Sequence, residues 1–421
     1  MSQSVNLTHQ AVEILRKNDM GGYTVPTLGL YPFQWNWDAG ITALGWLSID
    51  ENRAWVELEK LFEGQWENGM VPHVIFHQES DDYFPGPEQW GVNRALPTTS
   101  ISQPPLLATV MKILYEEGKD RQLAQNKLEL LFPKLLAYHR WWYKERDLHS
   151  TGLVSSFHPW ESGMDNSAAW DEALARVPQT EQAYERRDLN HVDSDQRPLK
   201  EQYDRYIYLV NFFKENAFDY ELIFNHCPYH TQDISLNAIL QRGTIDLVAL
   251  NQKLSQPYDL PDLEVEIERT RQAIASLWHE EKGLFLNRDQ HSGQAIDFAT
   301  TAGMLPLYGR SVSAEQASKM AIVIAEWLEA GKYGLASVHP ASEKFDAKRY
   351  WRGPSWLHIN WMIADGLHFY GHDELAERLR IRSREIIETA GYWEYFDPIT
   401  GEGCGGPDFS WTAAIALYWF L

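Results

Sequence analysis

The sequence contains little cysteine and no long hydrophobic run. Cys227 and Cys404 are the two cysteines among 421 residues, which argues against a disulfide framework and fits a reducing compartment. The apolar stretch FSWTAAIALYWFL, residues 409–421, is shorter than the ~20 residues that a membrane-spanning helix needs. The N-terminal residues MSQSVNLTHQ lack the basic and apolar regions of a signal peptide. We therefore expect a cytoplasmic protein with no membrane partner.

Positive charge is also scarce. Lysine and arginine total 37 against 59 aspartate and glutamate residues, a formal net charge of −22. Such a surface repels phosphates, so nucleic acid and anionic lipid are not expected partners, and the charge itself fits simple solubility.

Several common chemical motifs are missing as well. The sequence has no HExxH, no GxSxG and no paired CxxC. The glycine-rich GEGCGG at 401–406 does not follow a clear strand, as a nucleotide-binding loop would. HVDSD at 191–195 lacks the glycine and spacing of a calcium loop. We expect no cofactor and no metal.

Strand patterns are few, whereas helical periodicity runs through most of the chain. Only HVIFH (73–77) and LFLNR (284–288) read as short strand pieces. The sequence therefore predicts an all-α fold in one domain spanning 1–421, with helix pairs of similar length that could close into a barrel. Besides earlier helices, the predicted helical ranges are 121–146, 201–216, 231–254, 261–280, 296–308, 312–331, 354–370, 373–390 and 409–421.

Aromatic residues are abundant. The 18 tryptophans and 20 tyrosines exceed what a core of this size needs, and their flat faces and polar edges suit sugar rings. A large helical core filled with aromatic side chains would explain the same numbers, so their clustering in loops decides between the two interpretations.

One long polar segment interrupts the helical pattern. Residues 171–206 resemble a disordered linker in composition, yet the segment contains Tyr184, Tyr203 and Tyr206. Long loops in compact domains are often functional lids. We predict that 171–206 is a lid within the domain rather than a linker.

Two aromatic loops in the first half of the chain carry carboxylates. In YPFQWNWDAG (31–40), Trp35 and Trp37 flank Asp38, which is either the N-cap of a following helix or a hydroxyl acceptor in an aromatic pocket. In PWESGMDNS (159–167), Glu161 and Asp165 flank a glycine. Here the alternative is that Asp165 or a neighbouring serine caps a helix beginning near residue 168.

Two further aromatic loops lie in the second half. KRYWRGPSW (348–356) places Arg349 and Arg352 among aromatics, suited either to a polar ligand or to stacking at a helix start. In GYWEYFDPITGEG (391–403), Glu394 is surrounded by aromatic residues, which would raise its pKa unless it were paired. One carboxylate in mid-chain and one near the end is the arrangement that glycoside hydrolysis needs.

The ordered set FQWNWDAG, PWESGMDNS, YWRGPSW and YWEYFDPITGEG resembles glycoside hydrolase family 63 and spans the chain from residue 31 almost to its end. The resemblance implies an (α/α)6 barrel with a deep pocket and an inverting mechanism. Asp165 would be the general acid and Glu394 the general base, with the two carboxyl groups ~6.5–9.5 Å apart to admit a water molecule. The substrate-binding residues that the resemblance suggests are Tyr31, Trp35, Trp37, Asp38, Trp160, Glu161, Gly163, Tyr350, Trp351, Arg352, Trp356 and Trp411.

We expect no additional N-terminal β-domain of the kind that many family members carry. The chain is similar to compact members that hydrolyse mannosylglycerate or glucosylglycerate, which implies a small sugar substrate bearing a carboxylate. In a protein of charge −22, that carboxylate would need a local cation. We expect Arg205 to supply it, with Tyr83 and Gln103 assisting. Compact members often assemble, so a homo-oligomer is compatible with this assignment.

Other functions fit parts of the same pattern. A disaccharide α-glucosidase acting on kojibiose, nigerose or trehalose would have a neutral, aromatic subsite beside Asp165. A sugar isomerase similar to N-acylglucosamine epimerases would rely on histidines as acid and base, and a non-catalytic sugar-binding protein would use the carboxylates as hydroxyl acceptors. The histidines available for the isomerase reaction are His73, His77, His158, His339 and His358.

Overall fold

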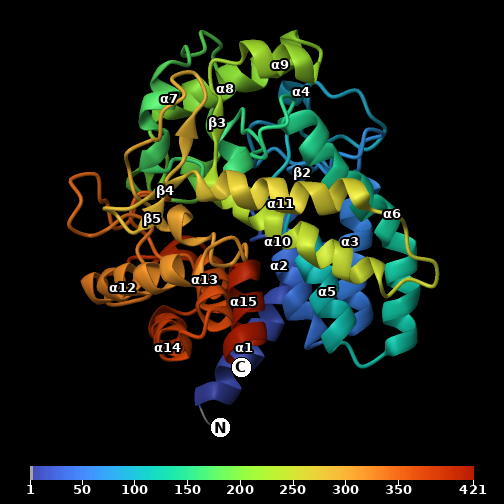
Figure 1. Ribbon diagram of the computed structural model, residues 1–421, viewed down its shortest axis with the longest axis vertical. Coiled ribbons are helices and arrows are strands. Elements are labelled where there is room, and N and C mark those ends of the chain that lie inside the picture. The colour runs from blue at the N-terminus through green and yellow to red at the C-terminus, as the bar shows by residue number, and fades with distance from the viewer. Residues whose placement is uncertain (1–2) are drawn as a thin grey trace.

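The computed structural model describes residues 3–421 and consists of two concentric rings of helices (Figure 1). Successive inner elements pack against each other: α2 against α5, α5 against α10, and α10 against a 3₁₀ turn at Thr301–Met304. Farther along the chain, α13 packs against α15, and α15 returns to α2. The inner helices are α2 (Asn36–Leu47), α5 (Leu107–Glu117), α10 (Ile234–Asn251), α13 (Leu357–Phe369) and α15 (Ser410–Ile415).

The outer helices cover this ring. Helix α3 packs on α2, α6 on α5, α11 on α10 and α14 on α13, while α1 packs on α15 and α12 on α14. The outer helices present one apolar face inward, whereas α2 and α13 are buried almost all round, as expected for the two rings of a barrel. The outer helices are α1 (Gln3–Lys17), α3 (Glu51–Glu63), α6 (Arg121–Arg146), α11 (Pro261–Ala275), α12 (Ala314–Ala330) and α14 (Asp373–Ala390).

The inner position between α10 and α13 is not an α-helix. The sequence predicts a helix over 296–308, and this prediction is wrong: only the 3₁₀ turn and further turns are present. Pro306 has no N–H for a helical hydrogen bond, and its ring disfavours helix in the preceding turn. Gly303 also approaches another segment closely, since an added Cβ would lie 2.3 Å from the carbonyl oxygen of Phe285.

The connections that carry the site are longer on one side of the barrel and contain only short strand pairs. Strand β1 (Gln34–Trp35) pairs with β2 (Val74–Ile75), and β7 (Trp393–Phe396) pairs with β8 (Gly403–Pro407). Two further pairs are β3 (Thr231–Gln232) with β6 (Arg288–Asp289) and β4 (Trp278–His279) with β5 (Leu284–Phe285). The connections also contain α4 (Pro87–Trp90), α7 (Asp171–Ala175), α8 (Lys200–Glu215) and α9 (Tyr220–His226). In Figure 1, α7, α8 and α9 lie together at the top, above the helices of the barrel.

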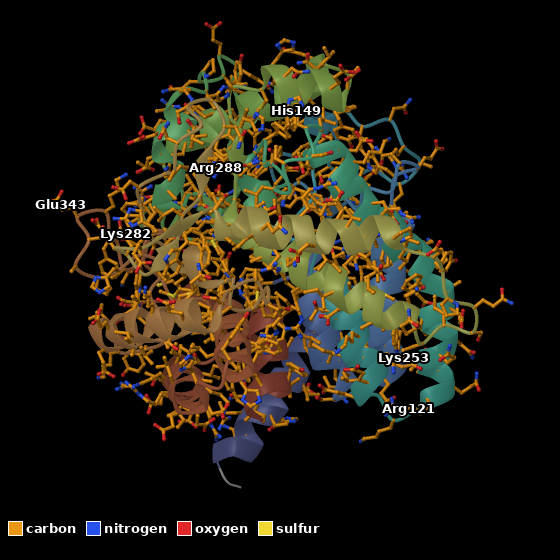
Figure 2. The ribbon with its side chains drawn as sticks, viewed as in Figure 1. Arg121, His149, Lys253, Lys282, Arg288 and Glu343 are labelled. Atoms are coloured by element: carbon orange, nitrogen blue, oxygen red, sulfur yellow. The ribbon has the colours of Figure 1, made fainter. Side chains whose placement is uncertain are left out.

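Many of the charged side chains lie at the surface. Figure 2 shows Arg121, Lys253 and Glu343 at the periphery of the molecule. Both cysteines are buried, and burial raises the pKa of each thiol, that of Cys404 to about 12. Within the part of the chain that is described, no helix is long and apolar enough to cross a membrane.

Candidate active site

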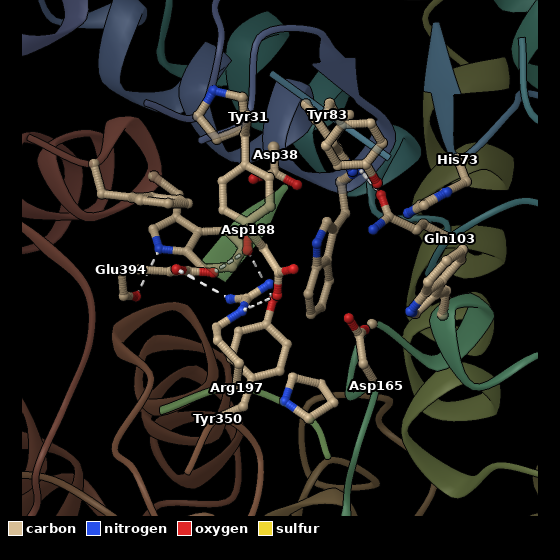
Figure 3. Close-up of a pocket in the computed structure, with 18 of the residues that line it drawn as sticks. Tyr31, Asp38, His73, Tyr83, Gln103, Asp165, Asp188, Arg197, Tyr350 and Glu394 are labelled. Atoms are coloured by element: carbon tan, nitrogen blue, oxygen red, sulfur yellow. Dashed lines mark hydrogen bonds and ion pairs between the residues drawn. The ribbon is translucent and has the colours of Figure 1, made fainter. Parts of the chain in front are cut away.

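A cavity with an empty volume of about 700 Å³ lies where the N-terminal ends of the inner helices α2 and α5 meet the long connections (Figure 3). Its walls combine carboxylates, one arginine and many aromatic rings. The residues that line it are Pro26, Tyr31, Trp35, Trp37, Asp38, His73, Tyr83, Phe84, Gln103, Trp160, Gly163, Asp165, Asp188, Arg197, Pro198, Tyr203, Tyr350, Glu394, Phe409 and Trp411.

The loop that carries Asp165 is held in place on both sides of that residue. The Tyr206 hydroxyl donates to the backbone carbonyl of Asp165 at 3.0 Å, and the Trp170 indole donates to that of Met164 at 2.9 Å. Gly163 has φ of +70°, and a Cβ there would lie 2.6 Å from the Trp37 ring. Only glycine therefore allows the turn to pass this close to the cavity wall.

Protein surrounds most of Asp165, but the residue is only partly buried and lines the cavity. Burial raises the pKa of Asp165 to about 7; Arg197 opposes this shift and Glu394 adds to it. The helix-cap interpretation does not hold for Asp165, because the Ser167 side chain caps the 3₁₀ turn at Ala168–Trp170. A carboxyl group with this pKa can carry a proton near neutral pH.

Glu394 lies on β7, on the opposite side of the cavity from Asp165 (Figure 3). Its Oε1 accepts a hydrogen bond from the Tyr31 hydroxyl at 3.0 Å, and its Oε2 accepts one from the Gly406 N–H at 3.2 Å. Arg197 Nη1 lies 3.8 Å from Oε2. Burial raises the pKa of Glu394, and Arg197 is the strongest of the groups that favour its charged form.

Asp38 is the third carboxylate of the cavity. It lies in the first turn of α2, and Trp35 occupies the N-cap position, so Asp38 is not the cap of that helix. Burial, followed by Glu394, raises the pKa of Asp38 well above its usual value. Trp37 and Trp411 pack edge to face beside it, with ring centres 6.0 Å apart. This corner of the cavity combines apolar ring faces with a hydroxyl acceptor.

Arg197 is the one arginine or lysine among the cavity-lining residues, and the sequence analysis did not select it. Its Nε donates to Asp188 at 3.1 Å, and its guanidinium stacks 4.3 Å from the centre of the Tyr350 ring. Arg197 Nη1 is buried and has no hydrogen-bond partner among the described residues. The sequence places Arg197 in the same polar segment as Arg205, but that segment has no periodicity that would indicate which arginine points inward.

Five of the predicted substrate-binding residues lie outside the cavity. Glu161 is fully buried behind it, where it pairs with Arg146 at 2.7 Å and accepts a hydrogen bond from the Phe157 N–H at 2.8 Å. Arg205 donates to the backbone carbonyls of Val177 and Glu201. These two side chains therefore have structural partners and no contact with the cavity.

The other three belong to the loop before α13. Trp351 and Trp356 stack face to face, with ring centres 3.8 Å apart. Arg352 pairs with Asp171 at 2.7 Å. Together they support the wall that Tyr350 forms, but they do not line the cavity.

The polar segment 171–206 packs over the cavity and contributes Asp188, Arg197, Pro198 and Tyr203 to its wall. It is fixed at several points: the Tyr395 hydroxyl donates to the backbone carbonyl of Gln196 at 2.7 Å, and the Gly405 N–H donates to its side chain at 2.8 Å. The lid function of the segment stays a prediction.

Comparison with known proteins identifies the family of this chain. A family model described as mannosylglycerate hydrolase MGH1-like glycoside hydrolase domain matches residues 31–412. The chain belongs to this glycoside hydrolase family. A mannosylglycerate hydrolase of Thermus thermophilus is 48% identical over 97% of this chain and 99% of its own length.

Two other matches bear on the family. A glucosylglycerate hydrolase of Mycolicibacterium hassiacum is 32% identical over 98% of this chain and 97% of its own length. The crystal structure of a glycoside hydrolase family 63 mannosylglycerate hydrolase from Thermus thermophilus in complex with Tris and D-glycerate matches with a TM-score of 0.96, at 46% identity over 99% of this chain and 100% of that one. These matches confirm the predicted family and its (α/α)6 fold.

The histidines do not favour an isomerase. Burial lowers the pKa of His73, His158 and His358 to about 3, and that of His77 to about 4. At neutral pH these rings are uncharged, so none of them supplies the imidazolium form that a histidine acid needs. Among the described residues, no group of three or more histidine, cysteine or acidic side chains is placed to hold a metal ion.

Proposed function

We propose that this member of the glycoside hydrolase family is an inverting α-glycosidase that hydrolyses α-mannosylglycerate or α-glucosylglycerate. Asp165 is the general acid and Glu394 the general base. The observation that carries the proposal is the pair of buried carboxylates on opposite sides of one cavity, each in a different electrostatic setting. Carboxyl groups that differ in this way suit the two roles.

The reaction proceeds in one displacement. Asp165 gives its proton to the glycosidic oxygen as the bond from that oxygen to the anomeric carbon breaks. A water molecule attacks the same carbon from the opposite side, and Glu394 accepts a proton from it. Tyr31, the Gly406 N–H and Arg197 favour the charged form of Glu394 that the attack requires. The products are glycerate and the free sugar of inverted configuration.

Arg197 is the cation that we assign to the carboxylate of the glycerate, in place of Arg205. It lies at the cavity, and its Nη1 has no hydrogen-bond partner among the described residues, whereas the other charged residues that line the cavity are acidic. An arginine that contacts a carboxylate gives a strong, charge-assisted hydrogen bond. The names of the relatives add support, since they act on mannosylglycerate and on glucosylglycerate. We assign the reaction to the cytoplasm, where buried cysteines such as those of this chain stay reduced.

The sugar ring is assigned to the corner formed by Trp35, Trp37, Asp38 and Trp411. Aromatic faces there match the C–H faces of a pyranose, and Asp38 accepts hydrogen bonds from its hydroxyl groups. The partner is thus a small sugar derivative. Both mannose and glucose are compatible with these contacts, so both substrates belong in the test.

The direct test follows the released sugar by NMR with mannosylglycerate, glucosylglycerate and a set of α-linked disaccharides. We expect hydrolysis of a glycerate glycoside, with the β-anomer of the sugar appearing first. First appearance of the α-anomer would overturn the acid and base assignments. Activity restricted to the neutral disaccharides would overturn the substrate class.

The roles of the two carboxylates can be distinguished with a substrate whose leaving group needs no acid. Fluoride leaves a glycosyl fluoride without much protonic assistance, so Asp165→Ala should lose ~10²–10⁴-fold in kcat on the glycerate glycoside but much less on the α-glycosyl fluoride. Glu394→Ala should lose activity on both, because both need the activated water. Equal losses in Asp165→Ala on the two substrates would remove Asp165 from the acid role.

A further inference from the structure

We propose that His73 binds the leaving group: its Nε2–H donates a hydrogen bond to an oxygen of the glycerate half of the substrate. The inference rests on the function proposed for the same cavity and adds a residue that this function does not otherwise employ. His73 directly precedes strand β2, whose partner β1 carries Trp35 into the cavity wall.

The imidazole of His73 is buried and has no hydrogen-bond partner among the described residues. The residue is 5% exposed and lines the cavity, and its ring lies over that of Trp160, with centres 6.0 Å apart and planes at 22°. Nδ1 is buried without a hydrogen bond. Nε2 has no hydrogen-bond partner among the described residues either, and it is not among the fully buried unpaired atoms, so we place it on the cavity side of the ring. Figure 3 shows the ring directed toward the interior, beside Gln103.

The burial of the two nitrogens indicates which one carries the proton. An orphaned buried N–H is rarer and more costly than an orphaned acceptor. The proton is therefore better placed on Nε2, at the cavity, than on Nδ1, which faces protein. A donor directed into a cavity awaits an acceptor on the ligand, such as a carboxylate, hydroxyl or ether oxygen.

His73 belongs to a wall of donors formed by His73, Tyr83 and Gln103. The Gln103 side chain accepts from the Trp37 N–H at 3.3 Å through Oε1, so its amide N–H groups remain free for the cavity. The Tyr83 hydroxyl likewise reaches the cavity. These donors have no protein acceptors, in a cavity that otherwise holds carboxylates, and they compensate for the loss of water around an anionic ligand.

The position of this wall assigns His73 to the leaving group rather than to the sugar. The leaving oxygen must meet Asp165, the proposed acid. In Figure 3, His73 and Gln103 lie on the side of the cavity that carries Asp165, opposite Glu394. Burial keeps the pKa of His73 at about 3, so the ring contributes a neutral N–H and does not compete with Asp165 as a proton source.

The test compares His73→Phe with the wild-type enzyme on two substrates. Phenylalanine preserves the packing on Trp160 and removes the N–H. We expect kcat/KM for the glycerate glycoside to fall about tenfold, the effect of one lost hydrogen bond. Hydrolysis of the α-glycosyl fluoride, which has no glycerate, should be unchanged. An equal fall on both substrates, or no fall on either, would overturn the inference.

His230→Phe is the matched control. His230 is 8% exposed, packs against Phe157 and Phe224, and lies outside the cavity. It should change activity on neither substrate. If the wild-type enzyme does not hydrolyse glycerate glycosides, the proposed substrate is wrong whatever the role of His73. In that case the role of His73 is tested by the ratio of kcat/KM for the best accepted glycoside to kcat/KM for the fluoride.

A measurement on the wild-type enzyme covers the case in which His73→Phe does not fold. Titration with D-glycerate, followed by the imidazole nitrogen resonances in NMR, should shift one neutral histidine, and His73→Asn identifies it. No histidine shift at saturating D-glycerate would overturn the contact.

Discussion

Four carboxylates line the cavity, and three of them, Asp38, Asp165 and Glu394, differ in their surroundings. Glu394 has two hydrogen-bond donors and Arg197 nearby, whereas Asp165 is partly desolvated and lies within the field of both Glu394 and Arg197. Asp38 is destabilised as an anion by burial and by the other two. Burial thus makes each of these carboxyl groups easier to protonate than a free acid, and a pKa of about 7 lets Asp165 carry a proton near neutral pH.

The pH dependence follows from these shifts. Activity requires Asp165 protonated and Glu394 charged, so kcat/KM should fall as the pH rises above about 7, the pKa of Asp165. The acid limb should lie above the usual range of a glutamate, because burial raises the pKa of Glu394. Because the two groups interact, the apparent pKa values of the two limbs belong to the pair of carboxyl groups and not to either one alone.

The measurement is a pH profile of kcat/KM for the glycerate glycoside, repeated for Asp165→Ala with the α-glycosyl fluoride. The fall at high pH should disappear in the variant. Persistence of that fall without Asp165 would show that another group causes it.

We predict that Glu161 acts on stability rather than on substrate. It is fully buried, and its partner Arg146 is surrounded by the rings of Trp141, Phe157 and Tyr220. Glu161→Gln would leave the Arg146 charge buried and unpaired, which typically lowers the free energy of unfolding by ~3–5 kcal/mol. Urea denaturation should detect this loss.

The control for Glu161 is an exposed ion pair of the same types. Glu13 and Arg16 lie 3.2 Å apart, with side chains 55% and 59% exposed, and Glu13→Gln should change stability by less than ~1 kcal/mol. An unchanged midpoint for Glu161→Gln together with a raised KM would restore Glu161 to the substrate site.

At the residue scale, the sequence identified the carboxylates but not the cation. Asp165, Glu394 and Asp38 stand beside tryptophans and glycines whose spacing signals a loop at a ligand site. Arg205 and Arg197 occur in one segment without a repeating pattern, and only tertiary contacts bring Arg197 into the cavity. Trp351 and Trp356 also carry the right chemistry, yet they stack on each other.

Among the elements, we predict that the attachment of the segment 171–206 controls access to the cavity. Gln196 holds it to β7 and β8 through two hydrogen bonds, next to the residue that provides the cation. Gln196→Ala removes the side-chain bond only. We expect a rise of several-fold in KM for the glycerate glycoside with little change in Tm, since a loosened Arg197 is less well placed for the ligand.

Asp193→Ala is the control for this segment. Asp193 is exposed and lies three positions away on the same stretch. Its replacement should leave KM unchanged. A large fall in Tm for Gln196→Ala would mean that the segment is part of the core and not a movable cover.

Element boundaries were predictable where helices are amphipathic or well bounded. The ranges 121–146 and 373–390 agree with α6 and α14. The predicted helix at 296–308 failed because the apolar residues of a buried segment have no preferred face, so their pattern cannot reveal that Pro306 and Gly303 force turns. The final helix also changes after Ile415 into a π-helical turn, Ala416–Phe420.

At the scale of the whole molecule, helices near the start and the end of the chain pack together and complete the barrel. Helix α15, near the C-terminus, packs against α1 and α2, so the last inner helix completes the ring begun by the first. In Figure 1, α1 and α15 lie beside each other in the lower part of the molecule. No element of the ring can bury its inner face without its neighbours, which predicts one domain rather than two.

Calorimetry tests this prediction. A single domain should unfold in one transition with equal calorimetric and van't Hoff enthalpies. The net charge of −22 should make the transition temperature rise with salt, because screening weakens the self-repulsion of the compact state. Two resolved transitions would contradict the one-domain prediction.

The inaccessibility of Cys227 and Cys404 makes this enzyme convenient for optical labelling. Both thiols are buried with raised pKa values, so maleimide reagents should leave the native chain unmodified. A single engineered cysteine at the exposed position 193 would then carry one fluorophore on the cover of the cavity. If 171–206 is the predicted lid, the emission of this fluorophore should change in real time as substrate binds and product leaves.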